Sequence, residues 1–211
     1  MARKRIIYLH GFASSPQSRK ARFFAAKFST EGFMVEIPDL AAGDFEHLTL
    51  SGQLRIVAEL LEGGPAILIG SSLGGYLAAL AAARYSQVEK VIMLAPAFGF
   101  YDLWQAEMGK EKFQEWRENR TISIFHYGEG KEAPLAFDLM EDAARYEAFP
   151  NVRQLGLIFH GVNDPVVAVA QSRRFAAARD NIQLLEFQSG HELTDVLDDM
   201  WSEARAFLVA H

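Results

Sequence analysis

Short aliphatic runs that alternate with longer amphipathic segments constrain the fold of this chain more than any other feature. Six runs rich in Ile, Leu and Val have the length of buried strands and occupy residues 6–9, 34–37, 66–69, 90–94, 155–159 and 182–187. Apolar residues at helical spacing occupy 19–28, 48–61, 73–85, 169–178 and 193–208. Parallel strands need such crossover helices, which cover both faces of the sheet. The pattern predicts a doubly wound, three-layer α/β fold with a mostly parallel sheet of about six strands.

One connection is too long for an ordinary crossover. About sixty residues follow the fourth predicted strand before the fifth begins, and we interpret residues 98–150 as an insertion. A helix is predicted near 102–116 and a hairpin around Gly128-Glu129-Gly130. We expect residues 1–211 to form one domain with this cap-like insertion, because no linker or repeat divides the chain. Aromatic side chains of the insertion could line a pocket or pack on the core: Trp104, Phe113, Trp116, Phe125, Tyr127 and Phe137.

Composition excludes several classes of partner. The 211 residues are 50% hydrophobic and 23% charged, as in an ordinary globular protein, and the net charge of −6 argues against a nucleic-acid surface. No apolar stretch approaches the roughly 18 residues of a membrane span, and no export signal is recognisable, so we expect a cytoplasmic protein. The chain has no cysteine and no metal-ligand spacing. We therefore expect neither a metal nor another cofactor.

A glycine-flanked serine follows the third predicted strand. Gly70, Ser72 and Gly74 form a G-x-S-x-G pattern between an aliphatic strand and an alanine-rich helix. A serine on a sharp strand-to-helix turn needs neighbours without side chains, because strand and helix approach closely there. Ser72 is therefore the candidate nucleophile. Ser71 is the rival, but the residues two positions away from it carry side chains; a simple helix-capping serine is the alternative interpretation.

A serine nucleophile requires a histidine base and a carboxylate that orients it. Asp164 follows the fifth predicted strand, and His191 follows the last one after Gly190, which should free the loop to bring the imidazole toward Ser72. Their order along the chain, Ser, Asp, His, suits an α/β sheet of this type. Asp164 could instead be an ordinary turn residue before proline, and His191 could cap the final helix. Glu192 ranks below Asp164 as the acid.

The loop after the first predicted strand is the candidate oxyanion loop. It begins at His10-Gly11-Phe12 and would lie at the carboxyl edge of the sheet beside the serine. We expect the backbone N–H groups of Phe12 and Leu73 to stabilise a developing oxyanion. A simple Gly-Ser-Pro turn is the alternative. For His10 and His160, each before a glycine at a strand end, we expect hydrogen bonds within loops.

Four segments together resemble the α/β-hydrolase superfamily, and within it the small bacterial esterases. They are residues 8–16, 70–75, 160–164 and 190–191. The resemblance covers nearly the whole chain from Ile6 onward. It implies Ser72 as nucleophile, Asp164 and His191 as its partners, and no cofactor. The chain departs from larger members because it lacks the antiparallel strands that often precede the first parallel strand.

The expected function is hydrolysis of a small-molecule carboxylic ester by a serine esterase. An acyl thioesterase would use the same three side chains. From a different class, a catalytically silent protein of the same fold could bind a ligand or partner, because a fold alone does not fix function. The physiological substrate, the acyl length and the oligomeric state are not encoded in any recognisable pattern.

Overall fold

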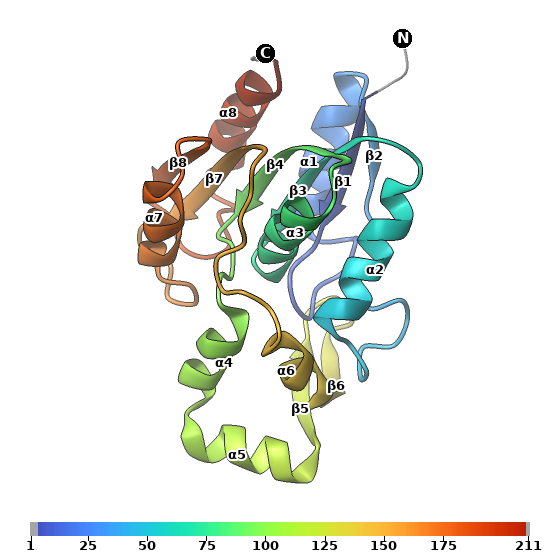
Figure 1. Ribbon diagram of the computed structural model, residues 1–211, viewed down its shortest axis with the longest axis vertical. Coiled ribbons are helices and arrows are strands. Elements are labelled where there is room, and N and C mark those ends of the chain that lie inside the picture. Colours follow the sequence, from blue (N-terminus) through green and yellow to red (C-terminus); the bar gives the residue numbers. More distant parts are fainter. Residues whose placement is uncertain (1–3, 210–211) are drawn as a thin grey trace.

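A six-stranded parallel sheet forms the centre of the molecule. In the computed structural model, which describes residues 4–209, its order is β2-β1-β3-β4-β7-β8 (Figure 1). All five pairings within it are parallel. The carboxyl ends of its strands therefore meet at one edge. The strand bounds are β1 Arg5–Leu9, β2 Met34–Glu36, β3 Ala66–Ser71, β4 Val88–Leu94, β7 Leu155–Gly161 and β8 Ile182–Phe187.

Helices cover both faces of the sheet and make the three layers. On one face α1 (Arg19–Thr30) and α8 (Leu197–Val209) pack through Phe24, Phe28 and Met200 against strand residues such as Ile69. The opposite face is covered by α2 (Leu50–Leu61), α3 (Leu73–Arg84) and α7 (Val169–Ala177). Two apolar clusters thus lie on either side of the sheet, as expected for strands buried on both faces. The predicted fold class is confirmed.

The predicted element boundaries shift mainly where loops enter the carboxyl edge. The third strand continues through Ser71 instead of ending at residue 69. The last helix begins at Leu197, four residues later than predicted, because Leu193 adopts a left-handed conformation with φ 53° that a helix does not accommodate. The apolar spacing at 193–196 belongs to a packed loop. Leu193 itself is buried against the second cluster.

The insertion has its own small set of elements. It contains α4 (Phe100–Met108), α5 (Lys110–Asn119), a hairpin of β5 (Thr121–His126) and β6 (Lys131–Ala136), and α6 (Asp138–Ala143). The hairpin turns where the sequence suggested, at residues 127–130. The single helix predicted at 102–116 is wrong: Gly109, with φ 78°, separates two helices. The interpretation of the whole chain as one domain stays a prediction.

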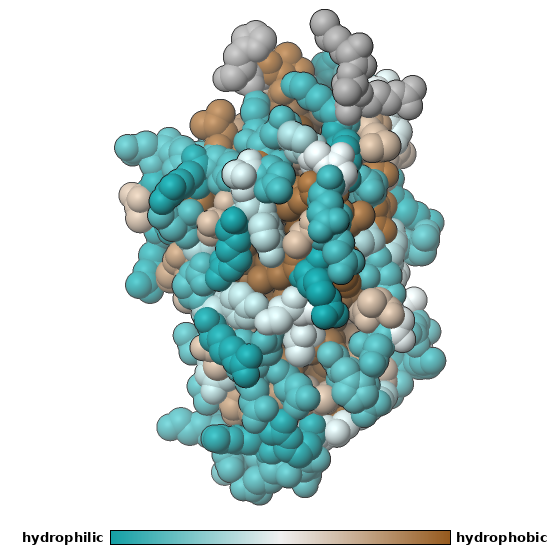
Figure 2. Space-filling model, turned by 45° about the vertical axis from the view of Figure 1, so that its right-hand side comes forward, coloured by the Kyte–Doolittle hydropathy of each residue, from teal (hydrophilic) through white to brown (hydrophobic). Residues whose placement is uncertain are grey.

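The insertion is polar on its outside and apolar where it packs. Its end of the molecule is mainly hydrophilic on the face shown in Figure 2. Phe113 and Trp116 of α5 are buried against Phe137, with ring centroids 5.3 and 5.2 Å from it. Within residues 4–209, no helix combines the length and apolarity required to cross a bilayer.

Gly74 provides a test of how closely α3 approaches β1. A Cβ at this position would overlap the backbone carbonyls of Leu9 and His10, which cannot move without disturbing the central sheet. We expect Gly74→Ala to lower the free energy of unfolding by about 1–3 kcal/mol, as overpacking of a core does. Urea unfolding measures this change.

Gly190→Ala is the matched control for that prediction. A Cβ there would meet no atom within 4 Å, and the residue is not in the left-handed region. Its free energy of unfolding should stay within about 0.5 kcal/mol of the wild-type value. Equal stability of both variants would contradict the close approach of α3 and β1.

Candidate active site

Ser72 lies on a strained turn between β3 and α3. Its backbone angles are φ 53° and ψ −117°, which a residue with a side chain rarely adopts. Gly70 and Gly74 allow this turn, because a Cβ on Gly70 would overlap the backbone of Gly74 and one on Gly74 would overlap Leu9. The tight junction presents the Ser72 side chain at the carboxyl edge of the sheet. Its backbone N–H donates to Leu94 O at 2.8 Å, which ties the turn to β4.

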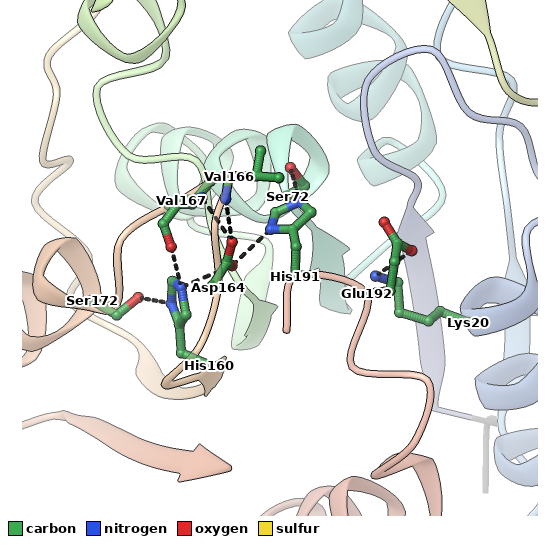
Figure 3. A network of polar contacts seen from close by, with 9 residues as sticks. All are labelled: Lys20, Ser72, His160, Asp164, Val166, Val167, Ser172, His191 and Glu192. Atoms are coloured by element: carbon green, nitrogen blue, oxygen red, sulfur yellow. Dashed lines mark hydrogen bonds and ion pairs between the residues drawn. The ribbon is translucent and has the colours of Figure 1, made fainter. Parts of the chain in front are cut away.

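The structure brings together the three side chains that the sequence singled out. His191 Nε2 lies 3.1 Å from Ser72 Oγ, and His191 Nδ1 lies 2.7 Å from Asp164 Oδ2 (Figure 3). A carboxylate can only accept, so Nδ1 carries a hydrogen and donates to Asp164. In the neutral ring Nε2 is then free to accept from the Ser72 hydroxyl. This tautomer is the one that suits a general base.

The carboxylate of Asp164 is fully buried but has four donors. Oδ1 accepts from the N–H groups of Val166 and Val167, both at 2.8 Å. Oδ2 accepts from His191 and lies 3.2 Å from His160 Nε2. Burial favours the neutral acid, yet hydrogen bonds from His160, His191 and Val167 outweigh it and hold the pKa of Asp164 well below its usual range. Asp164 is therefore an anion near neutral pH.

His160 has a role at this carboxylate that the sequence reasoning missed. Its Nε2 lies 2.8 Å from Val167 O and 3.2 Å from Asp164 Oδ2, and both atoms are acceptors, so Nε2 carries the hydrogen. Its Nδ1 lies 2.7 Å from the hydroxyl of buried Ser172. The expectation of hydrogen bonds within a loop describes only part of these contacts. The one sequence feature that could have suggested this role is the position of His160 four residues before Asp164. That spacing does not by itself reveal that His160 and His191 contact the same carboxylate oxygen.

The loop that carries His191 is fixed by several contacts. Ser189 Oγ donates to Asp195 Oδ1 at 2.5 Å, and Asn163 N donates to Ser189 O at 3.1 Å. The left-handed residue of this loop is Leu193, and Gly190 is outside that region. The sequence therefore assigned the loop's conformational freedom to the wrong residue. The absence of a side chain at Gly161 is more important for the position of this loop, since a Cβ there would overlap the carbonyls of Ser189 and Gly190.

The competing candidates are not joined to His191 by any hydrogen bond in the described part of the chain. Ser71 ends β3 and is buried. Glu192 pairs with Lys20 Nζ at 3.5 Å, and no contact joins it to the His191 ring among the hydrogen bonds of residues 4–209. His10 accepts from Leu40 N at 3.2 Å and bonds to Gly11 O at 3.0 Å, both within loops.

A cavity of about 770 Å³ opens beside Ser72 and His191. Gly11, Phe12 and Leu73 also line it. The loop after β1 lies next to the serine, because a Cβ on Gly11 would be 3.6 Å from Ser72 Cβ. Farther along, the same loop contains the turn suggested as the alternative, where Ser18 N donates to Ser15 O. The loop thus combines the turn with a position beside the candidate nucleophile.

The aromatic residues of the insertion divide between pocket and core. Trp104 and Tyr127 line the cavity together with Phe100 and Leu103 of α4. The Phe12 ring packs against aromatic neighbours: its centroid lies 4.8 Å from that of Trp104 and 5.6 Å from that of Phe45. The other predicted residues are not on its wall: Phe113, Trp116 and Phe137 are buried in the core, and Phe125 is exposed on the hairpin. Helical spacing could not separate these two groups.

Within residues 4–209, no three His, Asp or Glu side chains come together in a way that could hold a metal ion. Ser72 and His191 line the cavity together with Lys20, Glu192 and other polar side chains, and Asp164 bonds to the His191 ring. The arrangement can supply a nucleophile and a proton acceptor from the chain's own side chains.

The doubly wound parallel sheet, with its strand-to-helix turn at Ser72, places the chain among the α/β hydrolases in fold. The chain belongs to the family described as "Uncharacterised protein family (UPF0227)", whose model matches residues 5–208. The fold implied by the resemblance in sequence is confirmed. Among curated proteins, the sequence has no match.

Solved structures show the same fold at low sequence identity. Est1E from Butyrivibrio proteoclasticus with bound ferulic acid is 18% identical with a TM-score of 0.83; the match covers 98% of this chain and 88% of that one. Alpha/beta hydrolase domain-containing protein 10 from mouse is 20% identical with a TM-score of 0.82, over 99% and 91% of the two chains. A monoacylglycerol lipase from Paleococcus ferrophilus is 18% identical with a TM-score of 0.73, over 98% and 94%.

The lowered pKa of Asp164 predicts how stability changes with pH. In the unfolded chain this carboxyl regains an ordinary pKa of about 3.9 and takes up a proton first as the pH falls. Its contribution to the free energy of unfolding is therefore present near neutral pH and is lost on acidification. We expect Asp164→Asn to lose less stability than the wild type between pH 7 and about pH 3.5.

Urea unfolding at both pH values measures this difference, with Asp199→Asn as the control. Asp199 is an exposed carboxylate in the first turn of α8. The control should follow the wild-type pH dependence. An identical pH dependence in all three proteins would show that the hydrogen bonds to Asp164 do not favour its ionised form.

Proposed function

We propose that the protein is a serine hydrolase that cleaves carboxylic esters of small molecules through an acyl-enzyme intermediate. The observation that carries this proposal is the continuous hydrogen-bonded chain from Ser72 Oγ through His191 to Asp164 at the wall of a large cavity. The fold neighbours named above include Est1E with bound ferulic acid and a monoacylglycerol lipase, which is consistent with this chemistry.

The geometry supports a two-stage reaction. Ser72 Oγ attacks the ester carbonyl while its proton passes to His191 Nε2, and Asp164 stabilises the imidazolium that forms. His191 then returns the proton to the leaving alcohol, which departs and leaves an ester between the acyl group and Ser72. Water, deprotonated by the same imidazole, releases the acid and restores the hydroxyl. The ionised Asp164 balances the positive ring in both stages.

Backbone amides are proposed to stabilise the oxyanion. Leu73 opens α3, and the first N–H groups of a helix have no partner inside it. Phe12 follows Gly11 in the loop that packs beside Ser72, and it lines the same cavity. Two donors from Phe12 and Leu73 would act on charge that develops only in the transition state. Removal of one such donor costs about 2.7–4 kcal/mol in other enzymes.

The pocket favours an ester with an apolar group of moderate size. Its wall includes Trp104, Phe100 and Leu103 from the insertion and Val166 near the acid. A cavity of this volume accommodates a small molecule, as ligand pockets of about 300–1,000 Å³ do. A thioester could undergo the same reaction, because the leaving group changes but the three side chains do not. A silent binding protein is the alternative from another class.

Covalent labelling separates an active serine from a silent fold. We expect a fluorophosphonate to label the wild-type protein once, at Ser72, because an activated hydroxyl attacks phosphorus as it would a carbonyl. Ser72→Ala should not be labelled, and its ester turnover should fall by at least about 10³-fold. Intact-mass spectrometry and release of 4-nitrophenol from short-chain esters measure the two effects.

Ser71→Ala is the matched control for the nucleophile. It removes the neighbouring hydroxyl without disturbing Gly70 or Gly74, so labelling and a measurable fraction of turnover should remain. A comparable loss of labelling and turnover in Ser71→Ala and Ser72→Ala would contradict the assignment of Ser72 as the nucleophile. A wild-type protein that resists labelling altogether would favour the silent binding protein.

Turnover should depend on the imidazole of His191. This ring accepts the Ser72 proton in the proposed reaction, so its removal leaves the hydroxyl without a base. His191→Ala should abolish turnover and slow fluorophosphonate labelling by orders of magnitude. His47→Ala is the control, because this exposed histidine pairs with Asp44 away from the cavity. Labelling of His191→Ala at the wild-type rate would show that another group activates Ser72.

A further inference from the structure

A buried lysine lies beside Glu192, the residue that follows the catalytic histidine proposed above. Lys20, in the first turn of α1, lines the cavity although its side chain is only 9% exposed. Figure 3 shows its ammonium pointing from α1 toward the loop that carries His191. Burial lowers the pKa of Lys20, while neighbouring Glu192 and the more distant Asp164 favour the charged form. An ammonium in this position requires an anionic partner.

The partner present in the described chain is a weak one. Glu192 Oε2 lies 3.5 Å from Lys20 Nζ, at the long limit of a hydrogen bond, and its own side chain is 75% exposed. An ion pair with one exposed, mobile member contributes little net stability. The ammonium has three donors, and Glu192 engages it at one such long contact. Lys20 therefore retains capacity to bind a second anion from the cavity side.

The position of the charge also conflicts with the requirements of helix α1. Cations stabilise the C-terminal end of a helix and are unfavourable at its N-terminal end. Yet Arg19 and Lys20 are the first two residues of α1, and its first turn has no acidic residue. Gln17, Ser18, Arg19 and Lys20 all line the cavity. Cations at the N-terminal end of a helix go against its local electrostatic preference, and such a departure at a cavity wall is typical of a functional site.

We propose that Lys20 is a specificity-determining residue that binds an anionic carboxylate on the substrate, with Glu192 as the resident counter-ion that the substrate displaces. The substrate class is then an ester with an apolar portion against Trp104 and Leu103 and a carboxylate directed to the N-terminal turn of α1. Both the ammonium and the helix dipole attract such an anion. This inference rests on the proposed function, because it names the substrate class of the same site.

Matched substrates test the charge alone. The first pair is the 4-nitrophenyl monoester of adipic acid and the same compound with its free carboxylate methylated, which places the charge in the acyl half. The second pair is 4-acetoxybenzoate and its methyl ester, with the charge in the alcohol half. The readout is the ratio of kcat/KM for the anionic member to that for the neutral member.

Lys20→Met preserves the size of the side chain and removes its charge. It should lower the ratio by about 10-fold in at least one pair, the effect expected for the loss of a hydrogen bond to a charged group. Glu192→Gln should raise the same ratio, since it removes the competing carboxylate. Arg22→Met, on the exposed side of α1 and outside the cavity, should leave it unchanged.

The opposite response of the two variants distinguishes recognition from a structural role. If Lys20 and Glu192 merely fasten the His191 loop, both substitutions would reduce turnover of charged and neutral esters alike, and the proposal would be overturned. Unchanged ratios would overturn it as well. Should Lys20→Met fail to fold, Lys20→Arg must retain the anion preference and Glu192→Gln must raise it; otherwise the proposal is wrong.

Binding to the Ser72→Ala protein separates this inference from the proposed hydrolysis. Calorimetry should detect the anionic member of the preferred pair, with affinity about 10-fold lower in the Ser72→Ala/Lys20→Met double variant. Carboxylate binding without any wild-type turnover would reject the proposed function and keep the anion site. Turnover of neutral esters together with equal binding by the single and double variants would reject the anion site alone.

Discussion

The close approach of α3 to β1 and to the end of β3 is the constraint on which the rest of this molecule depends. At Gly70 and Gly74 any side chain would overlap backbone, so α3 meets the strands of the central sheet with no side chain between them. Ser72 adopts its strained conformation in the turn that joins them. The strain is tolerated because surrounding strands fix the turn, and the hydrogen bond from Ser72 N to Leu94 O adds one such restraint.

A second constraint is the burial of a carboxylate at the same edge of the sheet. An unpaired anion in this position would be costly, and the chain compensates with four donors around Asp164. Two of them are backbone groups of the loop that follows Asp164, which makes the local fold and the charge interdependent. His160 contributes from within β7, so the orientation of the proposed acid is set by the sheet as well as by the loop.

The insertion and α1 shape what the site can accept. Aromatic side chains of α4 pack on Phe12, so the insertion supports the loop beside Ser72 while lining the cavity. The hairpin adds a backbone contact, since Gly128 N donates to Ala13 O at 3.3 Å. On the other wall, α1 presents a buried ammonium where its own dipole disfavours a cation. The same cavity is thus lined by aromatic side chains and by a buried ammonium, which is the physical basis for the substrate class proposed here.

The sequence by itself determined the fold class, the six strands and the three side chains of the candidate site. Those features leave local signatures: aliphatic runs of strand length, glycines that flank Ser72, and Asp164 and His191 directly after strands whose carboxyl ends share one edge. Only the tertiary structure decided which aromatic residues face the cavity, where α8 begins, that His160 contacts Asp164, and that Lys20 is buried beside Glu192. Lys20 and Glu192 are far apart in the chain, and the burial of Lys20 depends on how α1 packs in the tertiary structure. Such long-range contacts have no local signature, because they arise from packing between elements and not from the preferences of either segment.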